Sequence, residues 1–151
     1  MKICRNFAVL AFLGLLLIGT DGYSQELGAR FGDALGNKSS VAVDAIFSLG
    51  KYSRIHADVS FGNGVGVEAL WDFIYRPLGD SPFNYYIGVG PSVFLGDPFI
   101  LGAAGEGGLE YRFKNAPIAL GIDYRPTFVI VETTGFHGGF GFNARYVFGS
   151  K

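Results

Sequence analysis

The 151-residue chain has little of what marks several common protein classes. It contains one cysteine, one methionine and one tryptophan, and its formal net charge is -1. A single cysteine excludes an intramolecular disulfide framework. Near-neutrality leaves no basic field, so we expect no nucleic-acid partner. After Gln25 there is neither an amphipathic period of about 3.6 residues nor an apolar run of roughly 18 residues, which argues against helices that span a membrane.

The amino terminus differs from the rest of the chain. Two basic side chains precede an apolar run over residues 7–18, which small residues follow up to Ser24. This run has the length of a signal-peptide core and is too short for a spanning helix. We therefore expect a cleaved signal peptide over residues 1–24 and one mature domain over residues 25–151, with an uncleaved anchor as the alternative. Cys4 would leave with the signal, so the mature chain would have no thiol.

The mature chain favours strands throughout. Glycine (24 residues) and aromatic residues (16%) are abundant, and polar and apolar residues alternate with period two. Turns rich in glycine, asparagine and proline separate the alternating segments, so consecutive strands should pair antiparallel. The expected strands cover residues 26–33, 40–49, 52–61, 64–76, 83–95, 99–113, 117–131 and 136–148. Their mean length of more than ten residues suits a tilted membrane crossing. The sequence thus predicts an all-β, up-and-down barrel of about eight strands.

Charged residues occupy one parity of these strands, opposite the large apolar residues. They are Arg30, Asp44, Arg54, Asp58, Glu68, Asp72, Arg76, Glu106, Glu110, Arg112, Asp123, Arg125 and Arg145. Eight strands enclose space only for side chains, so six arginines and seven acids on the inner face predict a lumen plugged by ion pairs. A narrow ion path through the same residues is the alternative. Glycines on this parity are expected to leave room for long side chains: Gly88, Gly90, Gly102, Gly108, Gly121, Gly139 and Gly141.

Alternation alone fits a soluble barrel with an apolar core as well as a membrane barrel with an apolar outside. The aromatic residues on the apolar parity decide between them because they gather near the strand ends. One group, at the end that holds the chain termini, is Phe47, Tyr75, Phe83, Tyr85, Tyr111, Phe113, Tyr146 and Phe148. A second group, at the other end, is Phe31, Phe61, Phe128, Phe136 and Phe140. Two aromatic girdles around an aliphatic band predict a transmembrane barrel.

Three segments carry a family resemblance. Residues 138–148, with the pattern GGFGFNARYVF, and the segments 109–113 and 121–126 resemble the eight-stranded outer-membrane barrels of Gram-negative bacteria, of the OmpA and OmpX type. The resemblance implies a location in the cell outer membrane, with outer-membrane lipid as the surroundings. It also implies periplasmic chaperones and the outer-membrane assembly machinery as partners during biogenesis, with Tyr146 and Phe148 as the assembly signal.

The two histidines are weak catalytic candidates. Asp58 and Ser60 share the face of His56, but alternate side chains on one strand lie about 7 Å apart. His137 lies near residues 132–134 at the other end of the barrel, and no serine flanks it. A metal site needs three or four convergent donors, and two histidines on separate strands without cysteine do not predict one. We therefore expect no metal, no cofactor and no enzymatic activity.

The leading functional hypothesis is a structural or envelope-integrity role for a closed outer-membrane barrel. The alternatives are a narrow, porin-like path for ions or small solutes, a lipid-modifying outer-membrane enzyme, and a soluble periplasmic barrel that binds a ligand.

Overall fold

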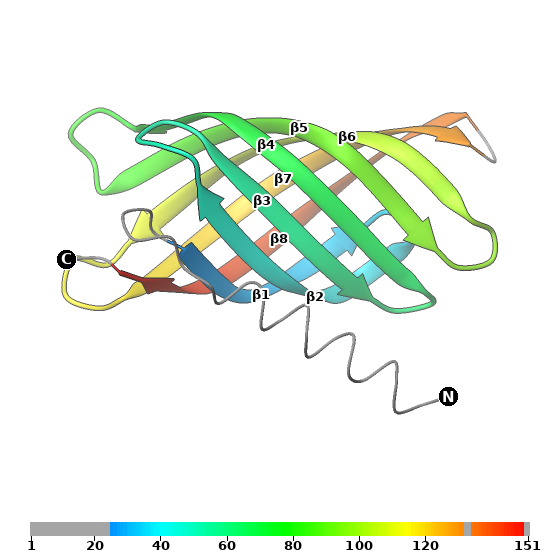
Figure 1. The fold of residues 1–151 in the computed structure, drawn as a ribbon, viewed down its shortest axis with the longest axis horizontal. Coiled ribbons are helices and arrows are strands. Elements are labelled where there is room, and N and C mark those ends of the chain that lie inside the picture. Colours follow the sequence, from blue (N-terminus) through cyan, green and yellow to red (C-terminus); the bar gives the residue numbers. More distant parts are fainter. Residues whose placement is uncertain (1–24, 132–133, 150–151) are drawn as a thin grey trace.

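A computed structural model describes residues 25–131 and 134–149, and shows a closed barrel of antiparallel strands (Figure 1). Every strand pairs with the next along the chain, and the last pairs with the first. The strands are β1 (Gln25–Ala34), β2 (Asn37–Ser48), β3 (Arg54–Phe61), β4 (Val65–Pro77), β5 (Phe83–Leu95), β6 (Ile100–Arg112), β7 (Ile118–Val131) and β8 (Gly135–Phe148). The prediction of an up-and-down antiparallel barrel is confirmed. The expected signal peptide, residues 1–24, lies outside the described residues.

The closing pair β1–β8 places both ends of the barrel domain at one rim. Gln25 is opposite Phe148 in that pair. We call this rim the terminal end, which also carries the β2–β3, β4–β5 and β6–β7 connections, and the opposite rim the distal end (left and right in Figure 1). Within the described part of the chain, no helix is long and apolar enough to cross a membrane.

The largest difference from the expected strand bounds is at the first hairpin. The sequence predicts a turn over residues 36–39, whereas Ala34 pairs with Asn37 across a two-residue turn. Gly36 has a φ of 74° there, a conformation that glycine adopts without steric cost. Strand β2 therefore begins three residues earlier than expected.

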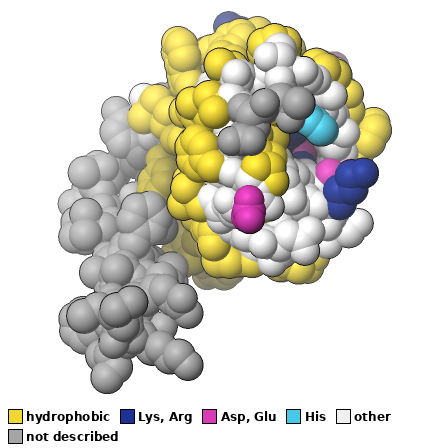
Figure 2. Space-filling view, turned by 90° about the vertical axis from the view of Figure 1, so that its right-hand side faces the viewer, with side chains coloured by type: hydrophobic (Ala, Val, Ile, Leu, Met, Phe, Trp, Pro, Cys, Tyr) yellow, Lys and Arg dark blue, Asp and Glu magenta, His cyan; other side chains and the backbone are white. Residues whose placement is uncertain are grey.

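The two faces of the sheet differ sharply in composition. Along β7 the buried side chains of Asp123 and Arg125 alternate with the exposed side chains of Ile122 and Tyr124. The same alternation runs around the barrel, and hydrophobic side chains cover much of the wall seen from the distal end (Figure 2). The barrel therefore has a polar interior and an apolar exterior.

A bulge in β4 reverses two sequence assignments. Asp72 pairs with Gly88 and Ile74 pairs with Ile87, so Phe73 is an extra residue in β4. Because side chains alternate with period two, one extra residue exchanges the faces of all that follow. The prediction that Tyr75 belongs to the outer girdle is wrong, since its hydroxyl lies in the lumen and donates to Glu110.

Arg76 changes face for the same reason. Its guanidinium lies outside the lumen, 4.5 Å from the centre of the Tyr52 ring, and the residue is exposed. The prediction that Arg76 belongs to the lumen charges is therefore wrong.

Candidate functional site: a charged network that fills the lumen

Charged side chains occupy most of the barrel interior. We call them the lumen network: the carboxylates of Glu26, Asp44, Asp58, Glu68, Asp72, Glu106, Glu110 and Asp123, the guanidiniums of Arg30, Arg54, Arg112, Arg125 and Arg145, and the imidazole of His56. All are buried except Arg112, whose side chain is 30% exposed. Twelve of the thirteen charges expected in the lumen lie there. Glu26 was not among them, although its parity matches that of Arg30 and could have placed it.

Arg125, on β7, joins carboxylates from four strands. Its Nη1 donates to Asp58 and, at 2.7 Å, to Glu68. Its Nη2 lies 3.1 Å from Glu106, and its Nε lies 3.6 Å from Asp123. The Cα atoms of Asp58 and Glu68 are register partners on β3 and β4. Like charges directly opposite each other destabilise a sheet, so Arg125 supplies the charge that lets these two side chains lie together.

Arg145, on β8, also binds several carboxylates, and it lies nearer the terminal end of the barrel. Its Nε donates to Glu26 at 2.8 Å, its Nη1 donates to Asp44 at 2.9 Å, and its Nη2 donates to Glu110. Glu110 also accepts hydrogen bonds from Arg54 at 2.9 Å and from the Tyr75 hydroxyl at 2.7 Å. These contacts tie β1, β2, β3, β4, β6 and β8 together through the lumen.

Inner glycines let long side chains cross the narrow lumen. Arg30 on β1 reaches Asp123 on β7, with Nη2 at 2.5 Å from Oδ1, and passes Gly141 of the intervening β8. A Cβ at Gly141 would meet the Arg30 guanidinium. In the same way, a Cβ at Gly108 would meet the ring of the buried Tyr86.

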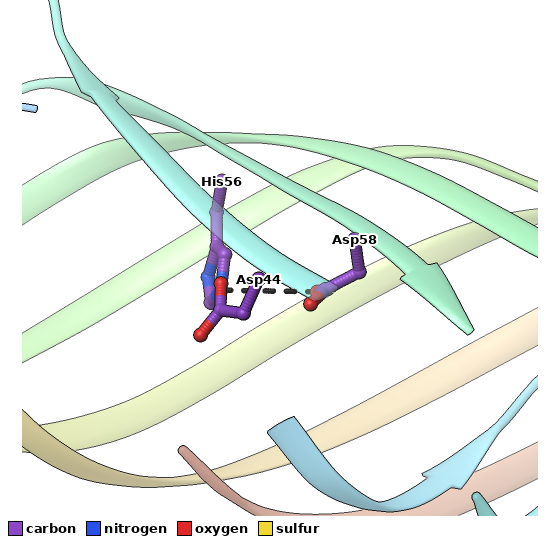
Figure 3. A group of neighbouring side chains, drawn as sticks. All are labelled: Asp44, His56 and Asp58. Carbon is purple, nitrogen blue, oxygen red and sulfur yellow. Dashed lines mark hydrogen bonds and ion pairs between the residues drawn. The ribbon is translucent and has the colours of Figure 1, made fainter. Parts of the chain in front are cut away.

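His56 lies at the centre of the lumen network. Its Nε2 is 2.7 Å from Asp44 Oδ1, and its Nδ1 is 3.0 Å from Glu106 Oε1. Asp58 is near, at 3.8 Å from Nε2, while Ser60 is contacted by the Asn37 amide at 3.4 Å. Arg125 Nη2 also lies 3.2 Å from Nε2. The structure thus places His56 among the acids, two of which appear in Figure 3, and one guanidinium, rather than beside a nucleophile.

His137 is exposed and lines a cavity of about 200 Å³ at the distal end. The buried side chains of Arg125 and Glu68 also line this cavity, and Figure 2 shows charged side chains within a hollow at that end. Two of the expected neighbours of His137, at positions 132 and 133, lie outside the described residues. None of the described side chains that line the cavity forms a hydrogen bond or an ion pair with His137.

The aromatic residues other than Tyr75 point outward as expected. Phe83, Phe113, Tyr146 and Phe148 are exposed, while Phe47, Tyr85 and Tyr111 are half-buried. Neighbouring rings contact each other, with centroids 5.3 Å apart for Phe83 and Tyr111 and 4.9 Å apart for Tyr146 and Phe148. The five phenylalanines of the second group are also exposed.

The lumen network holds more acidic than basic side chains. Eight carboxyl groups face five guanidiniums and one imidazole. The sequence predicts six arginines against seven acids. The loss of Arg76 to the exterior and the addition of Glu26 account for the difference.

Neither the models of known protein families nor the curated proteins include a match to this chain. Two designed proteins among the solved structures are similar in fold. One, described as "De novo design of transmembrane beta-barrels", is 13% identical, with a TM-score of 0.61 over 85% of this chain and 98% of that chain. The other, a solution NMR structure of the de novo designed TMB2.3, is 14% identical, with a TM-score of 0.60 over 87% of this chain and 100% of that chain. The likeness shows that the chain has the fold of an eight-stranded transmembrane-type barrel.

Proposed function

We propose that this protein is an integral outer-membrane β-barrel whose lumen is closed by ion pairs and whose role is structural, in the integrity of the cell envelope. One observation carries the proposal: large apolar side chains lie on the outside of the barrel, and charged side chains lie inside it. Twenty-eight large hydrophobic side chains are exposed on the described residues, while the lumen network is buried. Lipid is the surrounding that stabilises such an exterior.

The soluble alternative fits these observations poorly. A water-soluble barrel buries its large apolar side chains, and soluble monomers rarely expose continuous apolar surface of more than a few hundred Å². Among the described residues, the buried hydrophobic cluster consists of Leu35, Phe94 and Val129, with Ile100 packed against it. A soluble ligand-binding barrel would need an apolar cavity where this chain has charged side chains.

The outer membrane in particular is supported by the sequence. The expected signal peptide would export the chain, and the last strand resembles those of OmpA-type and OmpX-type barrels. Tyr146 and Phe148 lie exposed on the outer face of β8, where assembly machinery could bind them. Periplasmic chaperones would hold the unfolded chain before insertion.

The closed lumen favours a structural role over a pore. Arg125 on β7 crosses the interior to Asp58 and Glu68 on the opposite wall. Arg145 on β8 joins Asp44 on β2 to Glu110 on β6. An ion that passed through would have to displace these buried pairs, each held by several hydrogen bonds. We therefore expect no conductance in planar bilayers at high salt, and steady single-channel currents would overturn the closed-lumen proposal.

Fractionation tests the location. The full-length protein, produced in a Gram-negative host, should sediment with the outer membrane and migrate faster in gels before heating than after, since a folded barrel resists detergent until boiled. Recovery in the soluble periplasm would refute the proposal. Deletion of the gene in its own host should raise sensitivity to detergents, and an unchanged sensitivity would count against the envelope role alone.

A further inference from the structure

Two cations lie over one exposed aromatic ring at the terminal end of the barrel. Arg76 Cζ is 4.5 Å from the centre of the Tyr52 ring, and Lys51 Nζ is 5.2 Å from the same centre. Both distances are shorter than about 6 Å, the range in which an aromatic ring attracts a cation. All three residues are exposed. We call Lys51, Tyr52 and Arg76 the basic cluster.

The described part of the chain supplies no acid to balance the basic cluster. Neither Arg76 nor Lys51 forms an ion pair with a carboxylate of the described residues. The other five arginines in this part of the chain each pair with at least one carboxylate. Two positive charges near one ring repel each other, so an anion from outside the chain would stabilise the arrangement.

The bulge in β4 places Arg76 in the basic cluster. With Phe73 as an extra residue, Arg76 turns to the outer face of the sheet. Its register partner there is Tyr85, a member of the aromatic girdle at the terminal end. Tyrosine rings in such girdles lie at the level of the lipid headgroups. In a barrel that spans a membrane, the Arg76 guanidinium therefore lies near that level too.

The β2–β3 connection, which carries the rest of the basic cluster, is fixed to β4. The Tyr75 backbone N–H donates to the Tyr52 carbonyl at 3.1 Å, and Trp71 Nε1 donates to Ser53 Oγ at 2.7 Å. Within the connection, the Leu49 N–H donates to the Ser53 carbonyl at 2.9 Å. The backbone on both sides of the ring is thus held in place, so binding would need to order only side chains.

We propose that the basic cluster binds the phosphate of an anionic glycerophospholipid at the terminal end of the barrel, an inference that rests on the proposed membrane location. The planar Arg76 guanidinium can donate two parallel hydrogen bonds to phosphate oxygens, and the Lys51 ammonium adds a point charge. The Tyr52 hydroxyl can donate a further hydrogen bond. Two positive charges without an acid favour a headgroup of net negative charge over a zwitterionic headgroup.

General attraction between a basic barrel end and negatively charged lipid is the competing explanation. Lys114, in the β6–β7 connection, is also exposed at the terminal end. It forms no ion pair or ring contact with the described residues. Replacing Lys114 removes one positive charge from the same end and leaves the basic cluster intact. Lys114 is therefore the matched control for Arg76 and Lys51.

The test is lipid retention by the mature barrel folded in detergent. Native mass spectrometry measures the lipid that stays bound after phosphatidylglycerol or phosphatidylcholine is added. Wild type should retain phosphatidylglycerol in preference to phosphatidylcholine. Arg76→Gln and Lys51→Gln should each lower the affinity for phosphatidylglycerol about fivefold, the contribution of one basic side chain near an anionic surface. Both side chains lie outside the lumen, so the variants should fold, which heat-dependent gel mobility checks.

Two further arms complete the design. Lys114→Gln should bind phosphatidylglycerol as wild type does, and inorganic phosphate should not displace the lipid, because phosphate lacks the acyl chains that contact the apolar wall.

Four results would overturn the proposal. They are equal retention of the two lipids, unchanged affinity in Arg76→Gln and Lys51→Gln, an equal loss in Lys114→Gln, and displacement by inorganic phosphate, which would assign the basic cluster to free phosphate. Any of them in a barrel that fractionates with the outer membrane refutes the lipid site alone, whereas recovery of the protein in the soluble periplasm refutes the membrane location as well.

Discussion

Replacing Arg125 with methionine tests the energetic role of the lumen network most directly. Methionine keeps much of the side-chain length and removes the charge. Of the four carboxylates around Arg125, Glu106 keeps His56 and Asp123 keeps Arg30 as a cationic partner. Asp58 and Glu68 have no other arginine partner in the described part of the chain.

The expected cost follows from those two carboxylates. Removing one partner of a buried ion pair costs about 3–5 kcal/mol, because the other charge stays buried without compensation. Asp58 and Glu68 are also register partners, so their mutual repulsion would no longer be offset. A loss of about 3–5 kcal/mol is a large part of a typical stability of about 5–15 kcal/mol. We therefore expect Arg125→Met to fold poorly or to unfold at much lower urea concentration.

Urea unfolding of the detergent-folded or vesicle-inserted barrel measures this loss of stability. The chain has one tryptophan, Trp71, which lies on the exterior and donates to Ser53 at 2.7 Å, so its fluorescence reports the loss of the barrel wall. The matched control is Arg76→Met, an exposed arginine that lies over the Tyr52 ring. Loss of that contact should cost about 0.5–1 kcal/mol.

Comparing Arg125→Met with Arg76→Met tests whether the lumen ion pairs stabilise the fold. Equal effects of Arg125→Met and Arg76→Met would refute the view that the lumen ion pairs stabilise the fold. A triple variant with Arg125→Met, Asp58→Asn and Glu68→Gln should recover part of the loss, because it removes the charges that the single change leaves unpaired. No recovery would show that the arginine acts by packing rather than by charge.

Three further predictions use the same unfolding measurement. Tyr75→Phe should cost about 1–3 kcal/mol, because it removes the hydroxyl that donates to the buried Glu110. Tyr85→Phe, on the outer face, should change stability by less than about 0.5 kcal/mol. Similar effects of the two variants would refute the conclusion that the bulge turns Tyr75 into the lumen. Gly108→Ala should cost about 1–3 kcal/mol, because its Cβ would collide with the Tyr86 ring and the Ile122 carbonyl. Its neighbour Gly107→Ala should be tolerated, since a Cβ there meets nothing within 4 Å. Val89→Arg, on the exposed face, should cost about 2–4 kcal/mol in vesicles if that face meets the bilayer interior, and a neutral effect would contradict a lipid-facing wall.

Much of the architecture could be predicted from the sequence because period-two alternation is a local property. It placed His56, Asp58 and Ser60 on one face, and the structure places all three side chains inside the barrel. It failed after Phe73, where the bulge exchanges the faces. Ile74 gave no local sign of this, since Leu70 is an apolar residue on the same parity and lies buried inside the barrel.

The partners within the lumen could not be predicted in this way. Parity gives the face of a side chain, but its height depends on the stagger of the strands, which is a property of the closed barrel. Arg30 and Asp123 are 93 residues apart and lie on strands that are not neighbours. The convergence of Asp44 on His56 depends in the same way on register.

The inner glycines show that glycines on the same face of the sheet can be required for different physical reasons. At Gly141 the space of a missing Cβ is taken by the Arg30 guanidinium, as expected from its parity. At Gly90 a Cβ would instead meet backbone atoms of Ala69 and Leu70 on the adjacent strand, so this glycine permits close approach of two strands. Gly108 combines both reasons, because a Cβ there would meet the Tyr86 ring and the Ile122 carbonyl. Shortening Arg30 should therefore relieve Gly141→Ala, whereas no lumen side chain can be shortened to relieve Gly90→Ala, so paired variants separate the two kinds of glycine.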